Sequence, residues 1–158
     1  MATIMTRDAQ PYVSVRGVVT MQSIPEIADR FPEVFGWLAK HGVEPAGPPF
    51  LRYNVIDMER QLEIEAGVPV NAGVAGDDRV LARVLPAGRY ATVTHVGHPT
   101  GLLQATADLL EWAAERGLEW DVQETPAGEL WGCRLESYLS EPDVPMDNWE
   151  TELAFRLA

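Results

Sequence analysis

The stretch Arg60–Val70, RQLEIEAGVPV, decides the fold, because apolar and polar residues alternate in it one by one. One side of this segment carries Leu62, Ile64 and Ala66, and the other carries Gln61, Glu63 and Glu65. A period of two predicts a β-strand that turns one face to a core. The turn Asp57-Met58-Glu59 and the extended segment Phe50–Ile56 come directly before it, so we expect two neighbouring strands of one antiparallel sheet.

A strand and a helix precede this pair. Gln10–Thr20 is rich in valine and alternates in the same way, which predicts a strand. Between Ile24 and Lys40 the apolar residues recur every three or four positions, which predicts one amphipathic helix with Ser23 as its N-cap. Pro32 indicates a kink in this helix or the start of a new one. His41-Gly42 ends it, and the first half therefore has the order β-α-β-β.

The same order returns after a polar, glycine-rich linker at residues 71–78. The expected elements are the strands Arg79–Leu85 and Arg89–Gly97, the helix Gly101–Arg116, and the strands Glu129–Ser140 and Trp149–Leu157. We therefore predict a single α+β domain over residues 1–158, with halves at about 10–70 and 79–158. The fold is a tandem β-α-β-β repeat with pseudo-two-fold symmetry, an antiparallel sheet with two main helices packed on one face, and a central groove.

The net charge of the chain disfavours two classes of binding partner. Twelve Lys and Arg against 24 Asp and Glu give a net charge of −12, which disfavours nucleic-acid binding and attachment to an anionic membrane. The sequence has no apolar run of membrane length and no signal-peptide pattern, so we expect a cytoplasmic protein. His95 and His98 lack a nearby third ligand and Cys133 is the single cysteine, so no metal site and no cofactor are predicted.

Aromatic side chains and one glutamate are the candidate site residues. The chain holds five tryptophans and four tyrosines, enough to line a groove that stacks on a flat or cationic ligand, although most aromatic residues fill cores. Glu136 lies in the middle of an expected strand between Leu135 and Leu139. Its carboxylate points either to solvent, as is usual for glutamate, or into an apolar groove, where a raised pKa would suit general acid/base chemistry.

Short motifs follow one another along nearly the whole chain. They are Gly47-Pro48-Pro49-Phe50 before Tyr53, Leu62–Val70, Leu85-Pro86-Ala87-Gly88-Arg89-Tyr90, His95-Val96-Gly97-His98, Trp112, and Leu135-Glu136-Ser137-Tyr138-Leu139 before Pro142. In their order and spacing, from about Tyr12 to Leu157, the chain resembles the gyrase-inhibitor-like (GyrI-like) small-molecule-binding domain. That domain is also the effector-binding part of some multidrug-sensing transcription regulators.

The resemblance implies a tandem β-α-β-β fold with a central groove. It also implies that a glutamate on a strand of the second half, here Glu136, carries the positive charge of the ligand. Aromatic residues stack around the ligand in this family, and Tyr53 matches an aromatic position of the first half. The candidate ligand-binding residues are thus Glu136, Tyr53, Tyr138, Trp112, Trp131, Trp37 and Tyr90.

Three functions remain open from the sequence. The first is binding of a small hydrophobic, planar, neutral or cationic compound, for sensing or sequestration. The second is hydrolysis of reactive cyclopropane-bearing alkylating natural products, which the resemblance implies for some stand-alone members of the family. Glu136 would then be the general acid/base, and Tyr53 or Tyr138 a hydrogen-bond donor. The third is inhibition of a DNA-handling enzyme by an acidic surface. The expected partner is a small molecule, and either a homodimer or a separate regulatory protein would fit the unpaired sheet edges.

Overall fold

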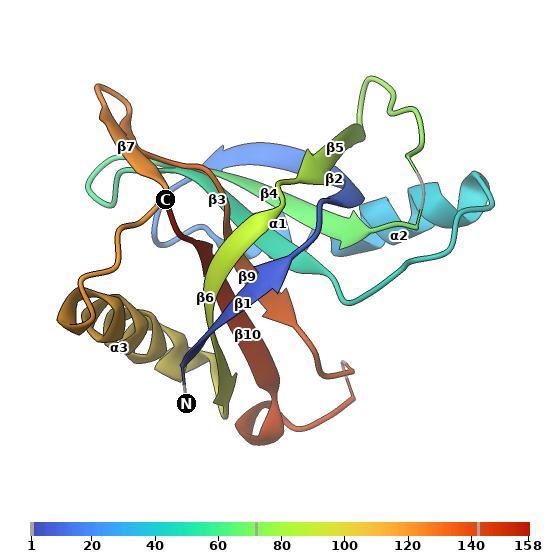
Figure 1. Ribbon diagram of the computed structural model, residues 1–158. Helices are drawn as coiled ribbons and strands as arrows, with labels where there is room; N and C mark the ends of the chain where they lie inside the picture. Colours follow the sequence, from blue (N-terminus) through green and yellow to red (C-terminus); the bar gives the residue numbers. More distant parts are fainter. Residues whose placement is uncertain (1, 72, 142) are drawn as a thin grey trace.

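The computed structural model describes residues 2–71, 73–141 and 143–158, which form one antiparallel sheet with helices on one face (Figure 1). The strands are β1 Thr3–Arg7, β2 Gln10–Val19, β3 Phe50–Ile56, β4 Leu62–Pro69, β5 Leu81–Leu85, β6 Gly88–Val96, β7 Val122–Thr125, β8 Gly128–Trp131, β9 Arg134–Tyr138 and β10 Glu150–Arg156. The helices are α1 Pro25–Ala28, α2 Phe31–Lys40 and α3 Leu102–Glu115, with 3₁₀ turns η1 Pro99–Gly101 and η2 Met146–Asn148. Ala72 of the expected linker and Pro142 lie outside the described residues.

The strand order repeats symmetrically about the middle of the sheet. It runs β1-β6-β10-β9-β3-β4-β2-β5, with the β7–β8 hairpin attached to β3. On one side of the β9/β3 contact the order β3-β4-β2 comes from the first half, and on the other side β9-β10-β6 comes from the second. The predicted α+β fold with its pseudo-two-fold β-α-β-β repeat is confirmed, and the two halves meet where β3 pairs with β9.

The sheet curls into a half-barrel, and its connections explain why. β5 lies at one end of the strand order and β6 near the other, yet only Pro86 and Ala87 separate them in the chain. The two ends of the sheet must therefore approach each other. A large apolar core fills the space between the sheet and the helices, and a smaller one on the opposite face gathers Tyr12, Phe50, Leu85, Tyr90, Cys133, Leu135 and Ala154.

Two details of the first helix differ from the prediction. The expected single helix is divided into α1 and α2 at Asp29-Arg30, because Pro32 lacks an N–H and fits the first turn of a new helix. Ser23 is not the N-cap: its hydroxyl accepts a hydrogen bond from the Thr20 N–H at 2.8 Å within the preceding turn, and Ile24 takes the cap position. Among the described residues, no helix is long and apolar enough to cross a membrane.

Several strands also differ from the expected ones. β1 and β7 were not predicted, and the expected strand Glu129–Ser140 is two strands, β8 and β9, separated at Gly132-Cys133. A Cβ at position 132 would collide with the Asp121 carboxylate, and β8 pairs with both β3 and β7. β5, expected to belong with the second half, pairs with β2 of the first.

Gly67 marks the tightest point of the smaller core and gives a first prediction. A Cβ at this position would lie 2.7 Å from Phe50 Cζ and 3.1 Å from Tyr12 Cδ2, two rings that are fully buried. We expect Gly67→Ala to lower the free energy of unfolding by about 1–3 kcal/mol through overpacking. The control is Gly36→Ala in α2, where nothing lies within 4 Å of the new Cβ and the helix gains about 0.5–1 kcal/mol. Urea denaturation measures both, and equal stability of Gly67→Ala and wild type would contradict this packing.

Candidate functional site

Glu136 and two tyrosines meet at the contact between the two halves. The Tyr138 hydroxyl donates a hydrogen bond of 2.6 Å to Glu136 Oε1, and the Tyr53 hydroxyl donates a longer one of 3.4 Å to Oε2. Glu136 and Tyr138 lie on β9 of the second half, whereas Tyr53 lies on β3 of the first. The structure thus brings together the three residues at the centre of the expected site.

Strand alternation explains why this carboxylate turns toward the helix-covered face. Residues two apart share a face, so Arg134, Glu136 and Tyr138 point the same way from β9. The residues directly opposite Glu136 are Leu51 on β3 and Leu153 on β10, and both are fully buried. Glu136 itself is partly buried. It is therefore a carboxylate flanked by apolar core residues, the less usual of the two environments considered from the sequence.

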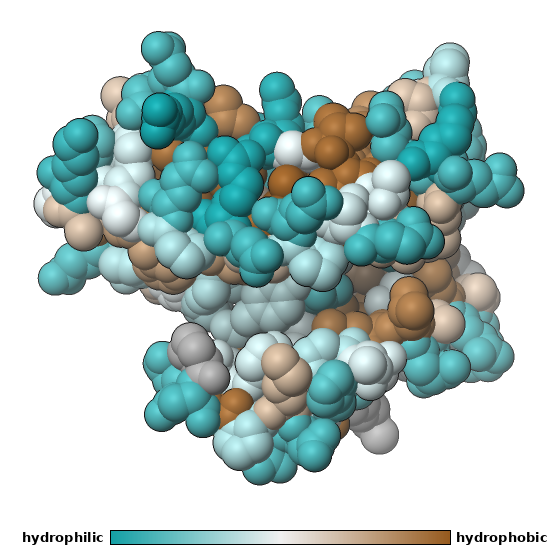
Figure 2. All heavy atoms as spheres, turned by 180° about the vertical axis from the view of Figure 1, so that it is seen from behind, coloured by the Kyte–Doolittle hydropathy of each residue, from teal (hydrophilic) through white to brown (hydrophobic). Residues whose placement is uncertain are grey.

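An aromatic side chain from α2 covers one side of this site. Phe31, the first residue of α2, packs edge-on against the ring of Tyr138 with 5.9 Å between the ring centres. The space-filling view shows a hollow across the back of the molecule, with α2 above it and the β9–β10 connection below (Figure 2). Sequence reasoning missed Phe31, although its place before Pro32 marks the start of the helix that the site needs.

Burial is the main influence on the ionisation of these groups. It raises the pKa of Glu136, whereas the hydrogen bonds from Tyr138 and Tyr53 and the charge of Arg134 act in the opposite direction. Burial, followed by the nearby Glu136 carboxylate, raises the pKa of Tyr53 and of Tyr138 well above the ordinary tyrosine value. Both hydroxyls therefore remain protonated donors, and they help a partly buried glutamate to keep its charge.

Arg134 lies in an aromatic box beside the glutamate. Its guanidinium carbon is 4.7 Å from the ring centre of Trp131 and 4.4 Å from that of Phe155. Burial lowers the pKa of this arginine, and the nearby Tyr53, Glu129 and Glu136 oppose that effect. Trp131 was predicted to stack on a ligand, but one of its neighbours in the structure is this internal cation. Sequence reasoning missed Arg134, which the i, i+2 spacing from Glu136 places on the same face.

Three other candidate residues have contacts of their own. The Trp37 indole donates a hydrogen bond of 2.7 Å to Asp77 Oδ2 and stacks on His41. Trp112 of α3 lies under the Arg116 guanidinium at 4.3 Å. Both tryptophans pack against the same large core as Tyr53 and Tyr138. Tyr90 instead belongs to the smaller core on the opposite face, where its hydroxyl donates to the Pro86 carbonyl at 2.6 Å.

The described residues offer no constellation for a metal ion. Among residues 2–71, 73–141 and 143–158, no three His, Cys, Asp or Glu side chains lie close enough together to share an ion. His95 and His98 contact each other through the ring of the first and the backbone carbonyl of the second, at 3.1 Å.

The raised pKa of Glu136 predicts a pH-dependent gain of stability in Glu136→Gln. The ligand-free fold tolerates the carboxylate less well than water does, so the neutral variant should melt higher at pH 8, by about 2–4 °C, the shift that about 1 kcal/mol causes in a chain of this size. The gain should be absent below pH 4.5, the ordinary glutamic acid pKa, and should grow until the pH passes the raised pKa. Thermal melts at pH 4, 6 and 8 measure it.

Glu150→Gln is the control for this prediction, because Glu150 is an exposed carboxylate on the neighbouring strand β10. It should melt with the wild type at all three pH values. If Glu136→Gln melts below the wild type at pH 8, the charged carboxylate stabilises the fold. The hydrogen bonds that Glu136 accepts would then outweigh the cost of its burial, contrary to this prediction.

Solved structures with the same fold include ligand-binding and regulatory proteins. The EcmrR C-terminal domain matches with a TM-score of 0.72 and 19% identity, over 100% of this chain and 97% of that one. SAV2435 bound to tetraphenylphosphonium matches with a TM-score of 0.66 and 11% identity, over 100% and 94%. A hydrolase from Listeria innocua matches with a TM-score of 0.61 and 14% identity, over 99% and 91%. These likenesses define the class of fold.

The sequence of the chain assigns it to a protein family. The chain belongs to the GyrI-like small molecule binding domain family, which it matches over residues 2–158. It covers only 57% of the EcmrR chain in the EcmrR–DNA complex, with a TM-score of 0.78 and 20% identity, so this domain corresponds to part of that protein. No curated protein matches its sequence. The predicted family and the coarse function, small-molecule binding, are both confirmed.

Proposed function

We propose that this domain binds a hydrophobic organic cation, or a neutral planar compound, at Glu136. The observation that carries the proposal is a partly buried carboxylate without an ion pair. Among the described residues, no Lys, Arg or His nitrogen lies within ion-pair distance of Glu136. Buried charges are normally paired, so this carboxylate is suited to a charge that a ligand supplies.

The two tyrosines support a ligand that cannot form hydrogen bonds. A lipophilic cation offers charge and aromatic or aliphatic surface but no N–H or O–H donor. Tyr53 and Tyr138 already supply the hydrogen bonds that keep the carboxylate ionised, so the ligand needs to contribute only its charge and surface. Phe31 and Tyr138 present ring edges and faces beside the carboxylate, which favours cation–π contact and burial of apolar area.

Tetraphenylphosphonium is the probe that tests this proposal, because a protein of the same fold has been solved with it bound. Titration of the full chain, followed by calorimetry and tryptophan fluorescence, should give saturable binding of one cation per chain. Phe31→Ala should weaken the affinity by about tenfold, because it removes an aromatic wall that a bound ligand would desolvate. Leu103→Ala on α3, an exposed apolar residue, serves as the control and should bind like the wild type. Absence of saturable binding, or equal loss in both variants, would overturn the proposal.

A hydrolase is the second candidate, and the raised pKa of Glu136 favours it. A general base acts best when its pKa lies closer to the working pH than that of an ordinary carboxyl group, and Tyr53 is placed to donate a hydrogen bond beside it. Incubation with a cyclopropane-bearing alkylating compound tests this function by chromatography. A ring-opened product that forms faster than in buffer and disappears with Glu136→Gln would support it. A rate equal to buffer would exclude it for that substrate.

A further inference from the structure

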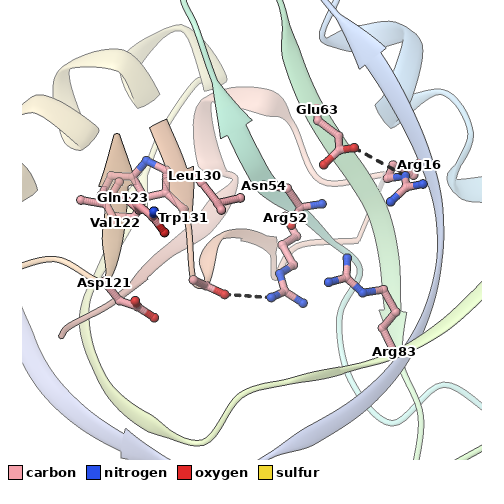
Figure 3. A pocket seen from close by; sticks show the side chains of 11 residues that line it. Arg16, Arg52, Asn54, Glu63, Arg83, Asp121, Val122, Gln123, Leu130 and Trp131 are labelled. Carbon is pink, nitrogen blue, oxygen red and sulfur yellow. Dashed lines mark hydrogen bonds and ion pairs between the residues drawn. The ribbon is translucent and has the colours of Figure 1, made fainter. Parts of the chain in front are cut away.

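We propose a second binding site, for a small organic anion, on the face of the sheet opposite the helices. A cavity of about 530 Å³ lies there between the β7–β8 hairpin and the strands β2, β3 and β5 (Figure 3). Three arginines line one side: Arg16, Arg52 and Arg83. On the opposite side Leu130 of β8 offers a partly exposed apolar side chain, and this volume is in the range of small-molecule sites.

Arg52 is the one arginine lining this cavity that forms no ion pair, among the residues that the structure describes. Arg83 pairs with Glu65 at 2.5 Å, and Arg16 pairs with Glu63 at 3.7 Å. Asp121, on the far rim, pairs with Arg156 at 2.7 Å. Arg52 instead donates to two neutral acceptors, the Tyr12 hydroxyl and the Gly132 carbonyl, each at 2.8 Å.

The Arg52 guanidinium is also incompletely hydrogen-bonded. Its side chain is only 6% exposed, and its Nε–H has no partner among the described residues. Figure 3 shows the guanidinium at the base of the cavity, with the Arg83 guanidinium close by. Buried polar groups without a partner are rare, and an ion or other ligand is one common reason for them. The planar fork of an arginine fits the two oxygens of a carboxylate or phosphate.

Glu65, opposite Arg52 on β4, is already paired with Arg83, and the other groups around Arg52 carry no negative charge. Burial raises the pKa of Tyr12, and it also raises the pKa of Cys133. The phenol and the thiol are therefore neutral at physiological pH. One positive charge remains at the base of a cavity in a chain with a net charge of −12. A ligand that carries a carboxylate or phosphate would balance Arg52, and its apolar part would lie against Leu130.

Calorimetric titration of the full chain at constant ionic strength tests the site with four probes. Benzoate and phenyl phosphate should each bind to one site per chain, because they join an anionic group to a ring, and their relative affinities tell carboxylate from phosphate. Inorganic phosphate should bind more weakly, since it lacks the apolar part, and neutral benzamide should not bind. If benzamide binds as tightly as benzoate, or if neither anion binds saturably, the proposal is overturned.

Arg52→Lys is the variant that assigns the anion to this residue. It keeps the positive charge and loses the planar fork, so the affinity for the better anion should fall by about 10- to 100-fold. Arg79→Gln, an exposed arginine outside this cavity, should leave the affinity unchanged. If Arg52→Lys does not fold, the Nε–H resonance of Arg52 in the wild-type chain gives the answer directly. It should shift during the titration, and a resonance that stays in place at saturation would overturn the proposal.

Discussion

Glu136→Gln is expected to weaken the binding of tetraphenylphosphonium by about 10- to 100-fold. The variant keeps the shape of the side chain and an oxygen that can accept the hydrogen bond from Tyr138. This bond is 2.6 Å long in the wild-type structure. It removes only the charge that would attract a ligand cation inside an apolar environment, where solvent screens the attraction poorly. Calorimetric titration at pH 8 measures the loss. The wild-type affinity should itself decrease as the pH falls through the raised pKa of Glu136, because the protonated carboxyl has no charge to offer.

Two controls separate this charge effect from a disturbed site. A neutral aromatic compound without a polar group, triphenylmethane, should bind the wild type and Glu136→Gln equally well, because its affinity depends on apolar contact alone. Glu150→Gln removes one of the other negative charges at an exposed position and should change the cation affinity less than twofold. If Glu136→Gln binds both ligands as tightly as the wild type, Glu136 is not the partner of the cation.

The element order of this fold could be read from the sequence, because it depends on local patterns. The alternation in Leu62–Pro69 and the apolar spacing in Leu102–Glu115 indicate β4 and α3 within a residue or two. The pairing of β3 with β9 cannot be read in this way, since these strands are far apart in the chain and no local pattern links them. β5 illustrates the same difficulty: it follows the linker, yet it completes the edge of the first half.

The candidate site, like the fold, could be predicted from the sequence only in part. The i, i+2 spacing of Glu136 and Tyr138 puts both side chains on one face, and the family resemblance pointed to Tyr53. Trp37 and Trp112 looked equivalent to these residues in the sequence, because a tryptophan on a helix gives no sign of which neighbour it will meet. In the structure Trp37 contacts Asp77 and Trp112 contacts Arg116, and both pack against the large core. The composition shows how many aromatic side chains the chain has, but only the strand register determines which of them lie next to Glu136.

Glu65 is the position where the alternating pattern is most misleading, and it carries the largest expected effect on stability. The pattern assigns Glu63 and Glu65 to the same side of β4, but Glu65 is completely buried whereas the Glu63 side chain is 32% exposed. Four side chains donate hydrogen bonds to the Glu65 carboxylate, at distances of 2.5–3.1 Å: Tyr12, Ser14, Asn54 and Arg83. The curl of the sheet is what closes this face.

Glu65→Ala should therefore lower the free energy of unfolding by about 3–5 kcal/mol, because it leaves the Arg83 charge and three buried donors without their acceptor. Glu63→Gln is the matched control on the same strand and face. Its pair with Arg16 is open to solvent, so the change should stay within about 1 kcal/mol. Urea denaturation with an unchanged m-value measures both effects. If the two variants lose similar amounts, the carboxylate of Glu65 is not the acceptor that holds the first-half strands β2, β3 and β4 to β5.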